Sequence, residues 1–522
     1  MANRTELNGR FSGTVPKGKN RSFKIIWGLP HQSNLNMTNH TDLDSLFNPD
    51  TIAMIGASPT PGKWGYLILL NMLKAGFTGR IYPVNPKAES ILGFKCYPTV
   101  VDIPESVDLA IITIPSAFVS PVIDECASKQ IRNIVLVTSN FSEAGKEGAA
   151  LEKEIVAKAE RQGLRIVGPN TMGIFSSESR LHALMPTLMP LHGSISMFSQ
   201  SGNVGVQMMD YGIHENLGFS KFVSSGNEAQ ITCVDYLKYF AADEATKVIM
   251  GYVEGFELDT DLLEVTKQIT LKKPVVFLKG GKSETGTKAA ASHSGSLAGS
   301  APINQGVFRQ AGIVEAITSL ELIDFAKSFA NSPLPAGNRV GIITRGGGWG
   351  VLTADACEQS GLVVPPLPDT LIREIDKILP EYWNRGNPID LVATIMNDPL
   401  PACLKMLVDW KGVDAVIVLG AGLQSFSYQV ADDLEGPEEL MKTVKFIRDL
   451  REENAVKPDP NLVLIADLVR QTGKPIVSVS MGSQFSHREF MEKYGILSFP
   501  TPERAVGALQ KMAEYSRYLA RN

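Results

Sequence analysis

Apolar and polar positions along this chain alternate in a regular way from Leu46 onwards. Short apolar runs, of the length of β-strands, are separated by longer stretches in which apolar residues recur at helical spacing. This alternation is typical of parallel sheets that carry helices on both faces. The first set of predicted strands covers 51–56, 79–85, 108–115, 131–139 and 163–170.

The same pattern recurs twice further along the chain. The second set of predicted strands covers 193–199, 219–226, 247–255 and 273–281. The stretch 331–338 is rich in Pro, Gly and Asn, which is typical of a linker. The third set covers 339–347, 414–422, 474–482 and 494–501, and a helix rich in Ala, Lys and Glu follows it.

These patterns predict an α/β protein of three consecutive doubly wound domains. We expect a Rossmann-like domain over 46–172, followed by two flavodoxin-like domains over 173–330 and 338–519. Residues 1–45 are expected to be a disordered segment or an extension. The first 40 residues are polar, with one acid, Glu6, and no signal-peptide core, so a targeting peptide, a disordered tail and an extension ahead of Met37 all remain open.

Composition and charge exclude several classes of partner. The formal net charge of −5 over 522 residues is too small to imply attraction to nucleic acid or an anionic membrane. No apolar run reaches the roughly 20 residues of a membrane-spanning helix. The five cysteines are odd in number and widely spaced, which argues against a disulfide framework or a zinc site. We therefore expect a cytoplasmic protein without bound metal, nucleic acid or membrane.

A Gly-rich turn, 56–65 (GASPTPGKWG), follows the first predicted strand and opens a helix. Such a turn presents backbone N–H groups and the positive end of a helix to a phosphate. Its spacing is not that of NAD-binding proteins, because Ser58 replaces a glycine and no acid for a ribose ends the next strand. Lys87 suggests an extra phosphate there. A tight turn without any ligand is the alternative.

Two further Gly turns, 198–210 (FSQSGNVGVQMMD) and 343–356 (ITRGGGWGVLTADA), have similar chemistry. Each points free N–H groups outward at a helix start. His293 stands alone in the small-residue run 288–299 (KAAASHSGSLAG), which holds no Cys, Glu or second His for a metal site. Together these features suggest a phosphorylated histidine between two helix ends. A loop histidine bonded to the backbone is the alternative.

The motifs occur in a recognisable order. GAS..PGK.G, VNPK, GPN..G, SQSG..G, VSSGNEA, V.GYVEG and GKSE.G..AA.SH.GSLAG follow one another along the chain. This order resembles the alpha subunits of ADP-forming acetyl-CoA synthetases, relatives of succinyl-CoA synthetase. The resemblance extends from Leu46 to the C-terminal helix, and the block around His293 is its most specific section.

The resemblance implies an acid–thiol ligase that reversibly converts acyl-CoA, ADP and phosphate into a carboxylic acid, CoA and ATP. Phosphate attacks the thioester, a histidine takes the phosphoryl group from the acyl phosphate, and ADP receives it. The histidine corresponds to His293, since neutral imidazole is nucleophilic near pH 7. Glu254 of YVEG matches the glutamate that pairs with this histidine. Glu228 of SGNEA is the rival partner.

The resemblance also implies the ligands and their residues. CoA is expected at the first domain, on Gly56, Ser58, Pro59, Lys63, Asn85, Lys87, Ile114, Pro115 and Asn170. Phosphate is expected at Ser201 and Gly202 in the second domain and at Gly346, Gly347 and Gly348 in the third. The chain has no room for an ATP-grasp domain. A separate ATP-grasp beta subunit, in an α2β2 assembly, is therefore expected to bind most of the ADP or ATP and Mg²⁺.

The third-domain turn departs from the family pattern Asn-Ala-Gly-Gly-Pro-Gly. Arg345 is expected to add a cation for phosphate, and Trp349 to reshape the acyl end, so the small organic acid that is the substrate stays open. A non-catalytic CoA-binding sensor or scaffold is the alternative function, and the presence of His293 argues against it. A nicotinamide-dependent dehydrogenase is disfavoured by the glycine spacing and the missing acid.

Overall fold

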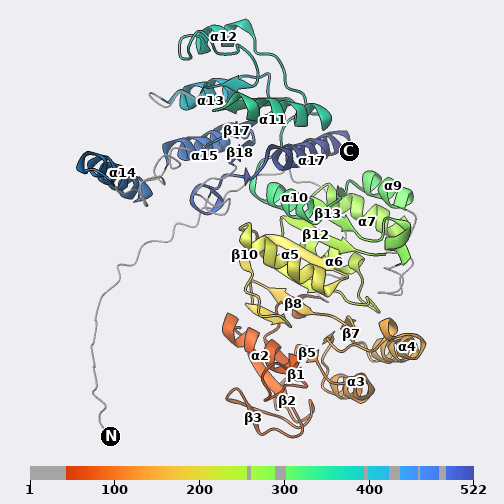
Figure 1. Cartoon of the computed structure of the whole chain (residues 1–522). Helices are drawn as coiled ribbons and strands as arrows, with labels where there is room; N and C mark the ends of the chain where they lie inside the picture. Colours follow the sequence, from red (N-terminus) through yellow and green to blue (C-terminus); the bar gives the residue numbers. More distant parts are fainter. Residues whose placement is uncertain are drawn as a thin grey trace, which may run out of the picture. The chain divides into compact units, whose positions relative to one another are not determined.

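The computed structural model describes residues 43–255, 260–288, 301–392, 398–421, 436–456, 459–480 and 490–522. These residues contain three sheets, two parallel and one mostly parallel, with helices packed against them (Figure 1). Each predicted strand overlaps an observed one, so the prediction of three α/β domains is confirmed. Among the described helices, none combines the length and the apolar character of a membrane span.

The first sheet consists of five parallel strands. They are β1 (Thr51–Ile55), β2 (Arg80–Val84), β5 (Leu109–Ile112), β6 (Asn133–Leu136) and β7 (Arg165–Val167), in the order β2-β1-β5-β6-β7. The accompanying helices are α1 (Asp44–Phe47), α2 (Trp64–Ala75), α3 (Val119–Ser128) and α4 (Lys146–Arg161), and a small antiparallel pair, β3 (Ser90–Ile91) and β4 (Phe94–Lys95), lies after β2. The central strands β1, β5 and β6 are buried along their whole length, which explains their unbroken apolar runs.

The second sheet has seven strands. Five are parallel: β10 (Leu191–Ser199), β11 (Gly218–Ser224), β12 (Val248–Val253), β13 (Val275–Lys279) and β14 (Val314–Ala316). β8 (Gly173–Ser176) and β9 (Leu181–Leu184) extend it as an antiparallel pair beside β11. The helices are α5 (Gly202–His214), α6 (Cys233–Ala242), α7 (Thr260–Thr270), α9 (Ala301–Ala311) and α10 (Ser319–Asn331).

The third sheet again has five parallel strands. They are β15 (Val340–Thr344), β16 (Ile389–Asp390), β17 (Ala415–Leu419), β18 (Ile476–Val479) and β19 (Ser498–Phe499), in the order β16-β15-β17-β18-β19. The helices are α11 (Gly347–Gln359), α12 (Asp369–Ile375), α13 (Leu400–Asp409), α14 (Glu438–Val456), α15 (Pro460–Thr472) and α17 (Pro502–Arg521).

All three sheets place their parallel strands in the same order. The second strand in sequence lies on one side of the first, and the third strand lies on its other side. The direction of winding therefore reverses between β1 and β5, between β10 and β12, and between β15 and β17. In open α/β sheets, ligands bind in the crevice outside the carboxyl ends of the strands at such a reversal. The fold thus defines three candidate crevices, and each predicted Gly turn opens into one of them.

Helix α17 belongs to the third domain by sequence but packs on both α10 and α11. The Arg504 guanidinium on α17 forms two hydrogen bonds with the Asp324 carboxylate on α10, at 2.7 and 2.6 Å. Glu215, directly after α5, accepts from the Lys327 ammonium at 2.8 Å and lies 3.9 Å from Arg504. This largely buried charge cluster ties the last helix to the second sheet.

Candidate functional site

The first Gly turn lies at the carboxyl end of β1. Gly56 has φ +86°, a conformation that L side chains rarely adopt. A Cβ atom at Gly65 would lie 2.1 Å from the Gly56 carbonyl oxygen, so the turn and the start of α2 approach too closely for a side chain. The N-cap of α2 is Lys63, and no side chain caps the helix. Its first N–H groups therefore point outward, as a phosphate site requires.

Asn85 and Lys87 lie beside this turn, after β2. The Asn85 amide donates from Nδ2 to the Ala57 carbonyl oxygen at 2.8 Å, and its Oδ1 accepts from the Lys87 N–H at 2.8 Å. The Asn85 side chain thus holds the ends of β1 and β2 together. The Lys63 and Lys87 side chains are exposed, so both cations are accessible to an anionic ligand.

The remaining residues predicted for CoA line the same sheet edge. Ser58 accepts from the Thr60 N–H at 3.1 Å and is followed by the exposed Pro59. Ile114 and Pro115 follow β5, and Asn170 follows β7 in the left-handed region, at φ +61°. Because parallel strands end at one edge, the structure gathers all nine predicted residues there.

The second crevice is built by the start of α5. Ser201 is the N-cap, and its Oγ accepts from the Val204 N–H at 3.4 Å. A Cβ atom at Gly202 would lie 2.2 Å from Cγ of Met172 and 2.9 Å from Oγ of Ser224. The close packing of Met172 and Ser224 against residue 202 therefore requires glycine there, whether or not a phosphate binds.

Gln200, which lies within the SQSG motif but was not predicted as a site residue, connects the two rival glutamates Glu254 and Glu228. Its Oε1 accepts from the N–H groups of Glu254 at 2.6 Å and Gly255 at 3.2 Å. Its Nε2 donates to the Gly255 carbonyl oxygen at 2.7 Å and to Oε2 of Glu228 at 3.1 Å. Its place directly after β10, one residue before the Ser-Gly turn, is the signal that could have pointed to it.

The environments of the two glutamates differ. Glu254 is 7% exposed, its Oε1 accepts from the Tyr252 hydroxyl at 3.3 Å, and the Lys279 ammonium donates to its carbonyl oxygen at 2.5 Å. Burial raises the pKa of Glu228 from 4.5 to about 6. The Oε1 atom of Glu228 has no hydrogen-bond partner within the described ranges. Glu254 therefore lies among donors and a cation, whereas burial makes Glu228 retain its proton more readily than an ordinary glutamate.

His293 lies outside the described residues, within 289–300. The chain reaches that segment from β13 through residues 280–288, of which 284–288 are helical, and Lys279 at the end of β13 pairs in register with Val253 of β12. Glu254 follows Val253 directly, so the chain leaves for the His293 segment at the same sheet edge that carries Glu254. Among the residues that the structure describes, no group of three or more His, Cys, Asp or Glu side chains is arranged to hold a metal ion.

The third crevice begins at α11, whose N-cap is Gly346 and which has no side-chain cap. The Thr344 hydroxyl accepts from the Gly346 N–H at 3.1 Å and donates to its carbonyl oxygen at 2.8 Å. A Cβ atom at Gly346 or Gly348 would meet nothing within 4 Å, whereas one at Gly347 would lie 2.9 Å from Oδ2 of Asp390. The helix start is thus open on one side and faces a carboxylate on the other.

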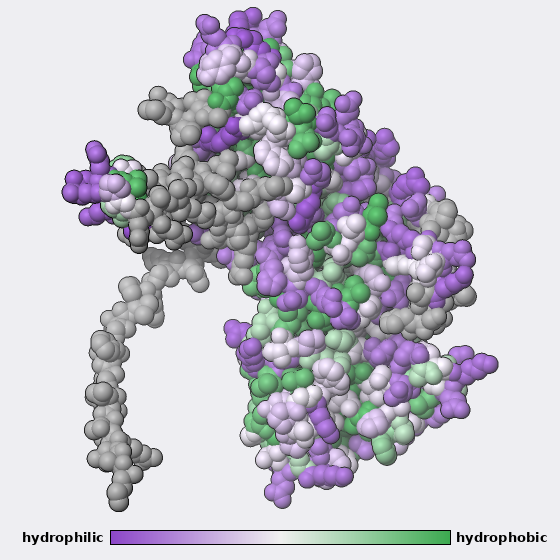
Figure 2. All heavy atoms as spheres, in the orientation of Figure 1, coloured by the Kyte–Doolittle hydropathy of each residue, from purple (hydrophilic) through white to green (hydrophobic). Residues whose placement is uncertain are grey.

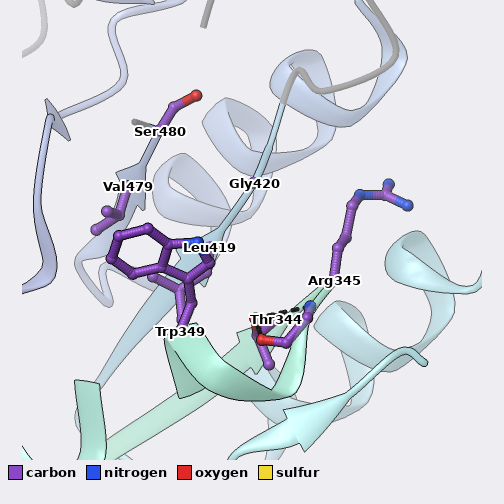
Figure 3. A pocket seen from close by; sticks show the side chains of 8 residues that line it. Thr344, Arg345, Trp349, Leu419, Gly420, Val479 and Ser480 are labelled. Atoms are coloured by element: carbon purple, nitrogen blue, oxygen red, sulfur yellow. Dashed lines mark hydrogen bonds between the residues drawn. The ribbon is translucent and has the colours of Figure 1, made fainter. Parts of the chain in front are cut away.

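A cavity of about 200 Å³ lies at this helix start (Figure 3). Its lining consists of Thr344, Arg345, Gly346, Trp349, Leu419, Gly420, Val479 and Ser480. The Arg345 guanidinium forms an ion pair with Asp398 at 2.6 Å, and Asn461 donates to the same carboxylate at 2.8 Å. Burial alone would raise the pKa of Asp398, but these two hydrogen bonds hold it below its ordinary value. The charge of Arg345 is therefore compensated within the chain.

Three known protein families match three separate stretches of the chain, one on each sheet. Residues 50–177 match the family described as CoA binding domain, 192–329 the succinyl-CoA ligase like flavodoxin domain, and 340–420 the ligase-CoA domain. Three such domains on three sheets of one order define a protein of the succinyl-CoA synthetase-like class.

Individual relatives narrow this class. The chain is 37% identical over 477 residues to the acetate–CoA ligase [ADP-forming] II subunit alpha of Pyrococcus furiosus, covering 91% of this chain and 98% of that protein. The dinucleotide-forming acetyl-coenzyme A synthetase 1 of Ca. Korarchaeum cryptofilum, solved with phosphate and ADP, is 35% identical with a TM-score of 0.77 and coverages of 92% and 98%. The chain belongs to the family of alpha subunits of ADP-forming acetate–CoA ligases.

A more distant relative has a larger substrate in its name. The chain is 29% identical over 487 residues to a trans-feruloyl-CoA synthase from an unknown prokaryotic organism, covering 91% of this chain and 65% of that protein. The acids named for the relatives therefore range from acetate to an aromatic acid.

Proposed function

We propose that this chain is the CoA-binding, phosphohistidine-carrying alpha subunit of an NDP-forming acyl-CoA synthetase. The observation that carries the proposal is the position of Glu254. It is a buried carboxyl at the reversal of the second sheet, held by Gln200, at the edge from which the chain leads to His293. A buried carboxylate in such a crevice suits a partner for a histidine that becomes positively charged.

The proposed reaction has three steps. Phosphate attacks the thioester carbon of acyl-CoA, the C–S bond breaks, and CoA leaves as an acyl phosphate forms. The neutral His293 ring attacks the phosphorus, and the bond to the acyl oxygen breaks to release the carboxylate. Glu254 accepts a hydrogen bond from the other ring nitrogen and offsets the positive charge on the ring. ADP then takes the phosphoryl group from His293 to form ATP.

In this proposal the first crevice binds CoA, and the second and third bind phosphate. Residues 46–172 bind CoA, with Lys63 and Lys87 on its phosphates. Residues 173–330 and 338–519 supply the two helix starts, at Ser201 and Gly202 and at Gly346, Gly347 and Gly348, for phosphate. Support comes from the exposed lysines and from the uncapped starts of α2 and α11, whereas the start of α5 is capped by the Ser201 side chain.

We propose an ATP-grasp beta subunit as the partner that holds ADP and Mg²⁺, in an α2β2 assembly. The relatives in Pyrococcus furiosus are named alpha subunits, which implies a beta subunit for them. A CoA-binding sensor or scaffold without catalysis is the alternative function, and phosphoryl labelling distinguishes the two.

Labelled ATP tests the proposal on the assembled complex. We expect an acid-labile, base-stable phosphoryl label that is absent in His293→Ala and strongly reduced in Glu254→Gln. His214→Ala, at the far end of α5, is the matched control and should retain the label. A label that persists in His293→Ala contradicts the assignment, and CoA binding without any label favours the sensor.

A further inference from the structure

A groove with a cationic rim lies between α9 and the end of α17, and none of its residues belongs to the three crevices. Two adjoining cavities of about 510 Å³ each form it, and both are lined by Arg309, Glu514 and Tyr518. Arg309 comes from α9, and Arg517 and Arg521 come from the last turns of α17. Figure 2 shows mostly hydrophilic residues at the surface around the end of α17. We call this site the arginine groove, after Arg309, Arg517 and Arg521.

The floor of the arginine groove holds its two helices together. The Tyr515 hydroxyl donates to the Thr270 carbonyl oxygen, and the Tyr518 hydroxyl forms a hydrogen bond with Oγ1 of Thr270 at 3.1 Å. A Cβ atom at Gly312, directly after α9, would lie 2.3 Å from the Tyr518 ring, so this ring packs directly on the backbone. These contacts fix the end of α17 against α7 and α9, and with it the spacing of the two segments that carry the arginines.

The two glutamates that line the cavities are already paired with lysines. Glu514 accepts from the Lys511 ammonium at 2.9 Å and from the Gln510 amide at 2.9 Å. Glu315 forms an ion pair with Lys282 at 2.7 Å. These carboxylates are therefore not free to compensate the arginines of the rim.

The three arginines carry charge that the described part of the chain leaves uncompensated. Arg309 donates from Nε to the Gln305 carbonyl oxygen at 3.4 Å, and none of the three forms an ion pair within the described ranges. Arg517 and Arg521 are four positions apart on one helix, so two like charges share a face. All three side chains are exposed. Because an arginine fork binds phosphate oxygens in pairs, this rim suits an anion with several phosphate oxygens.

Size and composition limit the class of ligand further. Each cavity lies within the roughly 300–1,000 Å³ of small-molecule sites. Linked phosphate groups offer oxygens to arginines on two helices at once, which a single phosphate group does less well. A protein partner would need an apolar centre to its interface, and none of the large exposed apolar side chains in the described ranges lines the groove.

We propose that the arginine groove binds an anion with two or more linked phosphate groups, either a free oligophosphate or the phosphate chain of a nucleotide. Arg517 and Arg521 hold one part of the phosphate chain, and Arg309 holds the other. The ligand thereby joins α17 to α9, the helix that begins at Ala301 directly after the segment that carries His293. The site uses no residue assigned to CoA, phosphate or phosphoryl transfer, so it stands apart from the proposed function.

Calorimetric titration of the full chain with triphosphate, ATP and orthophosphate tests this inference at low ionic strength, where screening is weak. We expect triphosphate to bind at least about tenfold more tightly than orthophosphate, because it reaches more of the arginines. ATP that binds as tightly as triphosphate identifies the phosphate chain of a nucleotide as the ligand. ATP that binds at least about tenfold more weakly identifies a free oligophosphate. Orthophosphate binding as tightly as triphosphate overturns the inference.

Variants of the exposed arginines locate the binding. Arg517→Gln combined with Arg521→Gln should weaken triphosphate about tenfold or more, and Arg309→Gln roughly threefold to tenfold, the value of lost charge-assisted contacts. Arg132→Gln combined with Arg373→Gln is the matched control, since it removes two exposed arginines outside the groove and changes the net charge equally. Equal affinities for triphosphate in the two double variants overturn the inference.

Amide hydrogen exchange identifies the segments that the ligand covers. With triphosphate bound, we expect slower exchange at the ends of α9 and α17, and this protection should be absent when Arg517 and Arg521 are both replaced by Gln. Protection confined to the Gly turns of the three crevices overturns the inference. So does a wild-type chain that binds no triphosphate but loses assembly with its partner subunit in that double variant, because the groove would then be a protein interface.

Discussion

The Oε1 atom of Gln200 accepts a hydrogen bond from the backbone N–H of Glu254 at 2.6 Å. This bond joins the ends of β10 and β12, the two strands between which the second sheet reverses. The same side chain reaches Glu228 and Gly255, so one amide sets the position of the loop that carries Glu254. Gln200 is thus a positioning residue for the proposed partner of His293.

Removing this amide should affect stability and phosphorylation together. In Gln200→Ala the N–H groups of Glu254 and Gly255 lose their acceptor, and the free energy of unfolding should fall by about 1–3 kcal/mol. Labelling of the assembled complex should fall as well, because Glu254 is no longer held. Gln207→Ala, on the exposed face of α5, is the control for urea unfolding and for labelling. Full labelling in Gln200→Ala would refute the positioning role.

Glu228 should make stability depend on pH in the direction opposite to most carboxyls. Its pKa is raised by burial from 4.5 to about 6, so the folded state binds the proton more tightly than the unfolded state. The stability that it contributes is fully present below about pH 4.5 and is lost as the pH rises through about 6.

The neutral variant Glu228→Gln should remove this dependence. At pH 7 its free energy of unfolding should exceed that of the wild type by on the order of 2 kcal/mol, and at pH 4 the two should agree. Urea unfolding across this pH range measures the difference, with Glu154→Gln on the exposed face of α4 as control. A wild-type protein whose stability rises between pH 4.5 and 6 relative to the variant would show the opposite sign and refute the argument.

Two lysines should contribute to CoA affinity. Lys63→Ala and Lys87→Ala should each weaken the binding of CoA by about 1–2 kcal/mol, roughly 5- to 30-fold in Kd. The reason is that a CoA phosphate loses a charge-assisted hydrogen bond when the lysine is removed. Lys74→Ala, exposed near the end of α2, should leave the affinity unchanged. Calorimetric titration measures the affinity of the chain for CoA and for NAD. Tighter binding of NAD would count against the CoA assignment.

The open side of α11 allows a clean test of the phosphate site. Gly348→Val introduces a Cβ atom that meets nothing within 4 Å, so the protein should fold with a loss of about 1 kcal/mol. The valine blocks the approach of phosphate, and labelling of His293 should fall about tenfold or more while CoA affinity stays the same. Gly507→Val in α17, also in open space, is the control. Gly202→Val is unsuitable, because its side chain would collide with Met172. Undiminished labelling in Gly348→Val removes the third domain from the phosphate site.

The charge cluster on α17 should be important for stability. In Arg504→Ala the buried carboxylate of Asp324, 3% exposed, loses its bidentate partner, which should cost about 3–5 kcal/mol. Arg470→Ala removes an exposed ion pair with Asp467 and should cost no more than about 1 kcal/mol. Thermal unfolding of both variants measures the contrast, and equal effects would mean that the cluster adds nothing beyond a surface pair.

Local patterns were sufficient to predict the three sheets. A central parallel strand is buried on both faces, so β1 or β17 appears in the sequence as an unbroken apolar run. The same patterns did not reveal β8, β9, β14 and β16, because strands of two to four residues have too few positions for a pattern to be visible. Glu254 was predicted as a site residue through the order of motifs, since nothing in its own neighbourhood distinguishes it from a surface carboxylate at a strand end.

The amino-acid sequence alone determined the elements, the Gly turns and the family, because these depend on residues that are neighbours along the chain. Only the tertiary structure decided which side chains meet. Arg345 and Asp398 are separated by 53 positions and become partners because β15 and β16 end at one sheet edge, so the carboxylate compensates the cation that was expected at phosphate. The Ser480 hydroxyl likewise borders a cavity with Trp349 only because β18 lies beside β17. Such contacts follow from strand order, which no local pattern encodes.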